Sequence, residues 1–355
     1  MKLERDLFVD YLRGLCIFMM IFVHFSSFLP FPIKPILSVG IDAVAEGFIF
    51  LAGMMVGLNS ITKFMTDPLK TSKKFVIRSL ELLIKNMLMI YTIWLPFGHI
   101  LTPTKFHGLT DYIDFSIRVA LLQEQPFALD ILTIFAYLFL FTPVILYLIK
   151  KQLEWVVIVL SIILFIGGLL NPYILSIKPE ETFPFSLWQV YFVGGVFFGK
   201  YYQIQNKNYG KINPNLIIVS VFFFISLLFR HFTGFLSDYF SIDFLKGIQF
   251  EKFPLNVYGF FYGLSVIFFI YQISLLLWPY LSKLWLINTF LVMYGKNSLR
   301  AFILHVYFDY IIRLIVKITN PPRYSIYIMI LIDTIFIYLI LKHWAKLKNL
   351  VKIKD

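Results

Sequence analysis

The sequence predicts an all-α, polytopic integral membrane protein with about ten transmembrane helices, whose N- and C-termini both face the cytoplasm. Composition is the first observation: 59% of the 355 residues are hydrophobic and the mean hydropathy is +0.79, far above the values of soluble domains. The second is length, because apolar stretches of about twenty residues, enough to cross a ~30 Å hydrocarbon core, recur from end to end. The third is charge, because Lys and Arg gather in alternate loops.

Apolar stretches define the predicted spans in chain order. The stretch 284–294 is also apolar, and it either extends the eighth span or lies along the membrane interface before the ninth. No loop is long enough to form a separate domain, so we predict a single transmembrane domain over 1–355. The spans lie at 11–29, 39–58, 75–98, 127–149, 153–170, 185–202, 214–231, 254–278, 297–316 and 324–343.

Basic residues set the predicted orientation. Short cytoplasmic loops collect Lys and Arg, and with the N-terminus inside, the cytoplasmic segments hold most of these residues. The net charge of +12 follows from this topology, and no nucleic-acid partner is needed to explain it. Cys16 is the single cysteine, which excludes an intrachain disulfide and a cysteine-ligated metal site.

Three ionisable residues of the first two spans lie near the external surface in this topology. Counting from the span ends, His24 lies about 7 Å below that surface, Glu46 about 9 Å and Asp42 about 3 Å. A short turn makes the two spans antiparallel neighbours, so the imidazole and the carboxylates can meet. A carboxylate bonded to one ring nitrogen leaves the other nitrogen to take a proton from a hydroxyl, which makes His24 a candidate general base. Alternatively, His24 and Glu46 form a buried polar pair that only holds two helices together.

A cationic group is predicted at the other end of the first span. Arg13 precedes His24 by eleven residues, which places both side chains on one helix face about 16 Å apart. Together with Lys74 and Arg78, at the inner end of the third span, Arg13 suits an anionic, phosphate-bearing ligand. Basic residues at inner helix ends are also ordinary membrane anchors, and Asp10 can pair with Arg13.

Several segments resemble a known family of membrane enzymes. The stretch RGLCIFMMIFVH (13–24) is similar to the R-x10-H signature of the acyltransferase-3 superfamily, and YGKNSLRAFILHV (294–306) is similar to its late G-x-x-S-L-x-x-(Y/F)-x-x-H segment. The OpgC-like branch, named for transfer of succinyl groups to osmoregulated periplasmic glucans, is closer still. Its features are resembled by ERDLFVDYLRG (4–14), DAVAEGFIFLAGMMVG (42–57), ALDILTIFAYLFLFTPVIL (128–146) and LWQVYFVGGVFFG (187–199).

The resemblance implies an O-acyltransferase of the bacterial inner membrane that uses cytoplasmic acyl-CoA as donor and has no permanently bound cofactor. The acceptor it implies is a hydroxyl of a periplasmic or surface polysaccharide, such as a lipopolysaccharide O-chain or a glucan. His24 matches the catalytic histidine, Arg13 the paired arginine, and Asp42 with Glu46 the acidic positions. His305 matches a second histidine, which we expect to position the acceptor. The superfamily's R-x-x-R near the third span is here Arg78-Ser-Leu-Glu81, so only Arg78 is carried over.

Other polar residues extend this interpretation. Asp130 and Gln189 lie at a depth where they can hydrogen-bond an entering sugar, and Trp188 can stack on its ring or anchor the helix at the interface. Asp309 follows His305 by one turn and is expected to orient it, whereas Asp333 has no assigned role. The remaining histidines do not have the spacing of a metal site. Gly195 and Gly199 form a G-x-x-x-G pattern, which predicts close helix packing.

Three questions stay open at this point. A transporter or flippase of glycans or lipid-linked precursors also uses ten spans with intramembrane charges, although the grouping of His24, Asp42 and Glu46 near one surface favours the enzyme. A succinyl donor calls for an additional cation near the thioester. None is clearly placed at the depth of His24, which favours acetyl-CoA over succinyl-CoA. The sequence leaves the oligomeric state open.

Overall fold

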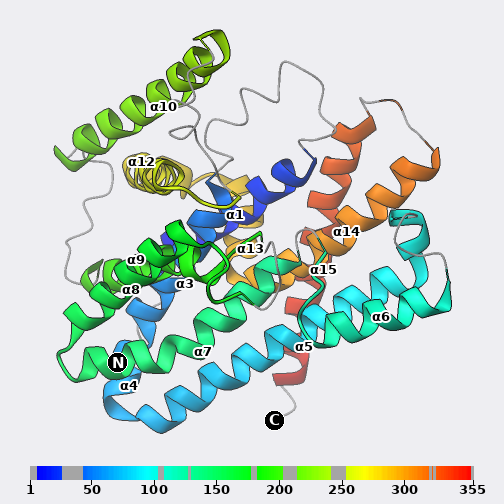
Figure 1. The fold of residues 1–355 in the computed structure, drawn as a ribbon, viewed down its shortest axis with the longest axis horizontal. Helices are drawn as coiled ribbons and strands as arrows, with labels where there is room; N and C mark the ends of the chain where they lie inside the picture. The colour runs from blue at the N-terminus through cyan, green and yellow to red at the C-terminus, as the bar shows by residue number, and fades with distance from the viewer. Residues whose placement is uncertain are drawn as a thin grey trace. The chain divides into compact units, whose positions relative to one another are not determined.

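A computed structural model describes residues 6–25, 43–102, 108–126, 129–176, 182–202, 214–240, 253–319, 322 and 325–352. These residues are almost entirely helical and contain no β-strand, which confirms the predicted all-α class (Figure 1). The helices are α1 (Leu7–Phe25), α3 (Val44–Asn59), α4 (Ile61–Thr66), α5 (Pro68–Leu101), α6 (Leu109–Ala120), α7 (Asp130–Lys150), α8 (Glu154–Leu170), α9 (Phe185–Tyr202), α10 (Pro214–Phe240), α12 (Val257–Leu281), α13 (Val292–Lys296), α14 (Ser298–Thr319) and α15 (Ser325–Lys352), with a π-helical turn η2 (Ile287–Leu291).

Five helices of the described part of the chain are long and apolar enough to cross a membrane. They are α1, α5, α7, α12 and the segment Tyr327–Trp344 of α15. The shorter apolar helices α3, α8 and the segment Ile217–Phe229 of α10 accompany them. A membrane protein is therefore indicated, while the number of ten spans and the cytoplasmic location of both termini stay predictions.

The chain divides into two compact units, each made of segments that are distant in sequence. The first unit comprises Met1–Phe48, Lys207–Phe232 and Tyr262–Asp355. The second comprises Ile49–Asn206 and Thr233–Phe261. This division leaves the prediction of a single domain untested, and each unit is described by itself.

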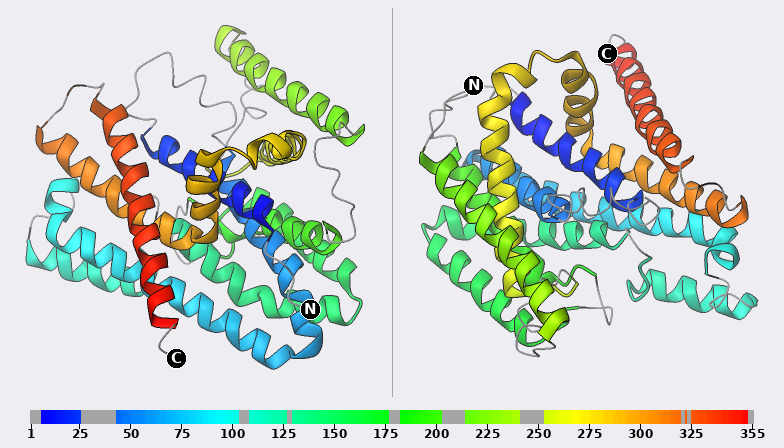
Figure 2. Two further views of the ribbon diagram at one scale, coloured as in Figure 1. Left: turned by 180° about the vertical axis from the view of Figure 1, so that it is seen from behind. Right: turned by 90° about the horizontal axis from the view of Figure 1, so that it is seen from above.

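In the first unit, α1 packs closely on η2 and α13 because glycines remove side chains at the contact. A Cβ atom on Gly14 would lie 1.8 Å from the carbonyl oxygen of Leu291, and one on Gly295 would lie 1.7 Å from that of Asp10. Helix α13 ends at Lys296 and α14 begins at Ser298 after a single capping residue, Asn297. Figure 2 shows α14 and α15, in orange and red, side by side in the first unit, and α1 contacts both.

In the second unit, α5 and α7 run side by side (Figure 1) and are joined by buried hydrogen bonds. The Ser79 hydroxyl donates to the Ala136 carbonyl at 2.7 Å, and the Asn86 amide donates to the Thr133 hydroxyl at 3.0 Å. In an apolar environment such polar contacts hold helices together, since the groups have no water to bond to.

The G-x-x-x-G prediction is confirmed in the second unit, where α9 meets the second half of α3. A Cβ on Gly195 would lie 2.0 Å from the Phe50 carbonyl oxygen, and one on Gly199 would lie 2.2 Å from that of Met54. Gly53 of α3 approaches α9 equally closely. The glycines thus allow the two backbones to touch.

Candidate active site

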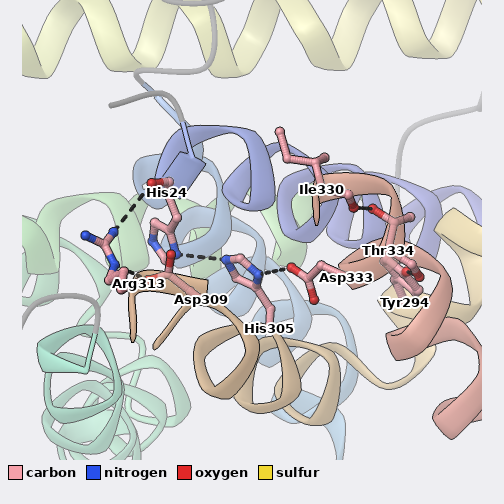
Figure 3. Close-up of polar contacts among 8 residues, drawn as sticks. All are labelled: His24, Tyr294, His305, Asp309, Arg313, Ile330, Asp333 and Thr334. Carbon is pink, nitrogen blue, oxygen red and sulfur yellow. Dashed lines mark hydrogen bonds and ion pairs between the residues drawn. The ribbon is translucent and has the colours of Figure 1, made fainter. Parts of the chain in front are cut away.

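Three side chains from three helices of the first unit form a hydrogen-bonded row. Nδ1 of His24, on α1, lies 2.8 Å from Nε2 of His305, on α14. The other ring nitrogen of His305, Nδ1, lies 2.7 Å from Oδ2 of Asp333, on α15. Figure 3 shows the row, with the two imidazoles edge to edge and Asp333 at its far end. The ring planes are inclined by only 23°, which suits an N–H···N bond in the plane of both rings.

Burial differs along this row. His305 and Asp333 are 0% exposed, whereas His24 is only half-buried. Phe25, the last residue of α1, covers the His305 ring edge-on at 6.1 Å between centroids. His24 is therefore the most exposed member of the row. Oδ1 of Asp333 is buried and has no hydrogen-bond partner among the described residues.

An arginine lies beside His24, at a position that sequence reasoning missed. The guanidinium of Arg313, two turns after His305 on α14, donates through Nε to Oδ2 of Asp309 at 2.8 Å. Its Nη2 lies 3.4 Å from the backbone carbonyl oxygen of His24 (Figure 3). The expectation of no cation at the level of His24 was therefore wrong. The signal was the spacing of His305, Asp309 and Arg313, each four residues apart on one helix face.

The partner of Asp309 corrects a second expectation. Its carboxylate pairs with Arg313 and not with His305, so it does not orient that histidine. The residue that bonds to His305 is Asp333, which is 28 residues away on another helix. Residue spacing within α14 favoured the nearer carboxylate, but the His305 ring points toward α15 (Figure 3).

The opposite end of α1 carries the predicted cation. Arg13 donates to the hydroxyl of Ser298, the first residue of α14, and one of its nitrogens lies 3.7 Å from the Asp10 carboxylate. The expected pairing of Asp10 with Arg13 is thus confirmed. Because Arg13 meets the start of α14 and His24 meets His305 further along, α1 and α14 run in the same direction.

The acidic residues of the second predicted span are only partly described. Asp42 lies outside the described residues. Glu46, near the start of α3, is buried, and its neighbour Gly47 packs on α1, where a Cβ would lie 3.4 Å from Sγ of Cys16. The catalytic assignment of Asp42 and Glu46 stays a prediction.

Five predicted binding residues belong to the second unit. Arg78 pairs with Glu81 at 3.1 Å, and Lys74 is exposed on the same helix, α5. Asp130 is buried at the first residue of α7.

Gln189 and Trp188 make packing contacts in that unit. The Gln189 amide donates to the Ser161 carbonyl at 2.8 Å and accepts from the Ser161 hydroxyl at 2.7 Å, which ties α9 to α8. The Trp188 ring is 0% exposed and lies parallel to Phe253, with 6.1 Å between centroids. Their predicted contacts with an acceptor stay untested.

Comparison with known proteins gives a match to a family. No curated protein and no solved structure is detectably similar to it. The family described as "OpgC protein" matches residues 5–352, a range that includes the whole hydrogen-bonded row of His24, His305 and Asp333. The chain therefore belongs to the OpgC protein family.

Proposed function

We propose that the protein is an acyl-CoA-dependent O-acyltransferase of the acyltransferase-3 type, with His24 as the general base. Family membership indicates a membrane-associated transferase of acyl groups, succinyl included, to glucans. The observation that carries the proposal further is the half-buried His24 imidazole, held through Nδ1 by a buried second histidine. A histidine held in this way presents its other nitrogen at a defined position, which general-base catalysis requires.

The proposed acyl transfer has two steps, an addition and an elimination. A glycan hydroxyl gives its proton to His24 while its oxygen attacks the thioester carbonyl carbon. The tetrahedral intermediate then collapses, the carbon–sulfur bond breaks, and the CoA sulfur leaves with a proton from His24 as the free thiol. The products are a glycan ester and CoA, and the imidazole is restored.

The donor is proposed to bind at the Arg13 end of α1. Arg13 is the proposed contact of a CoA phosphate, because guanidinium groups bind phosphate through charge-assisted hydrogen bonds. Lys74 and Arg78, in the second unit, stay phosphate contacts predicted from the sequence alone. Along α1, Arg13 and His24 are eleven residues apart, or about 16 Å, a distance that the pantetheine arm of CoA can span. CoA would thus enter from the cytoplasm, and the sugar from the other side of a bacterial inner membrane.

The acceptor is proposed to be a periplasmic or surface polysaccharide. Asp130 stays the hydrogen-bonding contact predicted from the sequence, whereas Gln189 and Trp188 pack inside the second unit. Arg313 removes the reason for preferring acetyl-CoA, since a cation does lie beside His24. Acetyl and succinyl are therefore both retained as candidates for the transferred acyl group.

The test is mass spectrometry of purified periplasmic and surface glycans from wild type, a deletion strain, and that strain carrying wild-type, His24→Gln or His343→Gln protein at equal membrane abundance. His343 is exposed near the end of α15 and serves as the matched control. We expect an acyl mass increment that is lost on deletion, restored by wild type and His343→Gln, and absent with His24→Gln. An increment that deletion leaves unchanged, or that His24→Gln restores, would contradict the proposal and favour a transporter or flippase.

A further inference from the structure

We infer that His305 and Asp333 are positioning residues that hold His24 in the tautomer whose lone pair is on Nε2. The inference rests on the proposed function in that it takes His24 as the base. It assigns a role to Asp333, an acidic residue in the middle of an apolar helix, and a new one to His305. Both ring nitrogens of His305 are occupied by protein groups, so it is placed to support His24 rather than to bind the acceptor.

Proton positions along the row follow from the charge of Asp333. An ionised carboxylate has no proton to give, so Nδ1–H of His305 donates to Oδ2 of Asp333 across 2.7 Å. A neutral imidazole carries one proton, and Nε2 of His305 is then an acceptor. Nδ1 of His24 lies 2.8 Å from it and must be the N–H donor. The lone pair of His24 is thereby placed on Nε2, the nitrogen that takes the proton from the acceptor hydroxyl.

The opposite charge state would disable the base. If Asp333 carried a proton, it would donate to Nδ1 of His305, Nε2–H of His305 would donate to His24, and Nε2 of His24 would carry the hydrogen. The carboxylate charge of Asp333 therefore selects the active tautomer of a histidine that it does not touch. The same charge also stabilises the imidazolium that His24 becomes during the reaction, through the intervening ring.

The inference takes Asp333 to be ionised, with Nδ1 of His305 as its hydrogen-bond donor. The second buried carboxylate of the cluster, Asp309, is already paired with Arg313 at 2.8 Å. Asp333 is thus the carboxylate that bonds to His305. The three residues of the row lie on three different helices, so the packing of these helices fixes their relative positions. A histidine without such support would rotate about its side-chain bonds and exchange tautomers in place.

Asp309 provides a matched control for Asp333. Both carboxylates are 0% exposed and both lie within this cluster, but Asp309 contacts Arg313 and lies outside the row. Asp309→Asn therefore removes an equally buried charge and leaves the bonds from Asp333 to His24 intact.

The experiment measures acyl transfer by purified full-length protein in lipid nanodiscs. Labelled acetyl-CoA and succinyl-CoA are the donors, glycans extracted from the deletion strain are the acceptors, and release of CoA thiol gives the rate. We expect Asp333→Asn and His305→Gln each to lower kcat about 100-fold, with the KM for acyl-CoA within about 2-fold of wild type. Asp333→Glu should recover at least about 10-fold over Asp333→Asn, since it restores the carboxylate. Asp309→Asn should lose less than about 10-fold.

The double variant gives the decisive comparison. If Asp333 acts only through His305, then His305→Gln/Asp333→Asn is no slower than His305→Gln alone. Three results would each overturn the inference. The first is a loss of kcat in the double variant that equals the product of the two single losses. The others are equal losses of kcat for Asp309→Asn and Asp333→Asn, or an Asp333→Asn variant with full activity. An inactive His24→Gln beside an active Asp333→Asn defeats the positioning role alone, whereas an active His24→Gln defeats the proposed base itself. Thermal unfolding of each variant separates misfolding from lost chemistry, and Asp333→Glu carries the test if Asp333→Asn does not fold.

Discussion

Nδ1 of His24 lies 2.8 Å from Nε2 of His305, although 281 residues separate the two along the chain. The contact joins α1 to α14, and a second contact, from Arg13 to Ser298, joins the same helices at another level. One helix therefore presents a guanidinium near its start and an imidazole near its end. Donor binding and proton transfer can be tested separately by substitutions at these two places.

Arg13→Gln is expected to weaken donor binding with little effect on the chemical step. Loss of the guanidinium removes the proposed charge-assisted contact to a CoA phosphate, so the KM for acyl-CoA should rise about 10-fold while kcat changes less than about 3-fold. Steady-state kinetics with the purified protein measures both constants. Lys151→Gln, which removes an exposed cation at the end of α7, is the control. A collapse of kcat at constant KM would instead place Arg13 in the chemical step.

Arg313→Gln is expected to change the preference between acyl groups. A cation beside His24 favours a donor whose acyl chain ends in a carboxylate, so the ratio of succinyl to acetyl transfer should fall about 10-fold. Competition between the two labelled donors measures that ratio directly. Arg300→Gln is the control, because Arg300 is on the same helix but stacks on Trp344 at 4.7 Å. An unchanged ratio would show that Arg313 does not contact the acyl chain.

Gln189→Ala is expected to lower stability without changing acceptor binding. The substitution removes both buried hydrogen bonds between Gln189 and Ser161, which should cost about 1–3 kcal/mol of unfolding free energy. Thermal unfolding in detergent gives the stability, and the KM for the glycan gives the binding. Ser161→Ala should produce part of the same loss, and the double variant should not add the two. A raised glycan KM with unchanged stability would instead favour a direct contact with the acceptor.

Gly14→Ala is expected to disrupt the contact between α1 and η2. The new Cβ would lie 1.8 Å from the Leu291 carbonyl oxygen, and because that atom belongs to the backbone, a helix must move. Overpacking of this kind costs about 1–3 kcal/mol or more, and the transferase should lose activity as His24 shifts with its helix. Gly167→Ala is the control, since nothing beyond the adjoining backbone of α8 lies within 4 Å of a Cβ at that position. Equal unfolding temperatures for the two variants would argue against the close approach.

Periodicity along single helices predicted much of this arrangement. Arg13 and His24 do lie on one continuous helix, Asp10 does pair with Arg13, and the glycines of α9 do meet a neighbouring backbone. These features depend only on residue spacing within a few turns, which a sequence displays directly. The sixth predicted span, 185–202, coincides with α9 for the same reason.

Partners from distant helices could not be predicted in this way. Proximity in the chain favoured Glu46 as the partner of His24, because the first two spans are joined by a short segment. The structure pairs the His24 ring with His305 and places Asp333 behind it, and nothing in spacing alone relates α1 to α14 or α15. An acidic residue in an apolar helix, such as Asp333, did mark a position of interest, but its partner became visible only in three dimensions.

The unit that holds this row joins segments that are far apart in the sequence. Because synthesis proceeds toward the C-terminus, α1 is made long before α14 and α15, and 281 positions separate His24 from His305. A nascent or prematurely terminated protein then has a first helix without its supporting residues. With His24 as the proposed base, such a fragment lacks the residues that fix its tautomer, so a chain truncated before α14 is expected to show no acyl transfer.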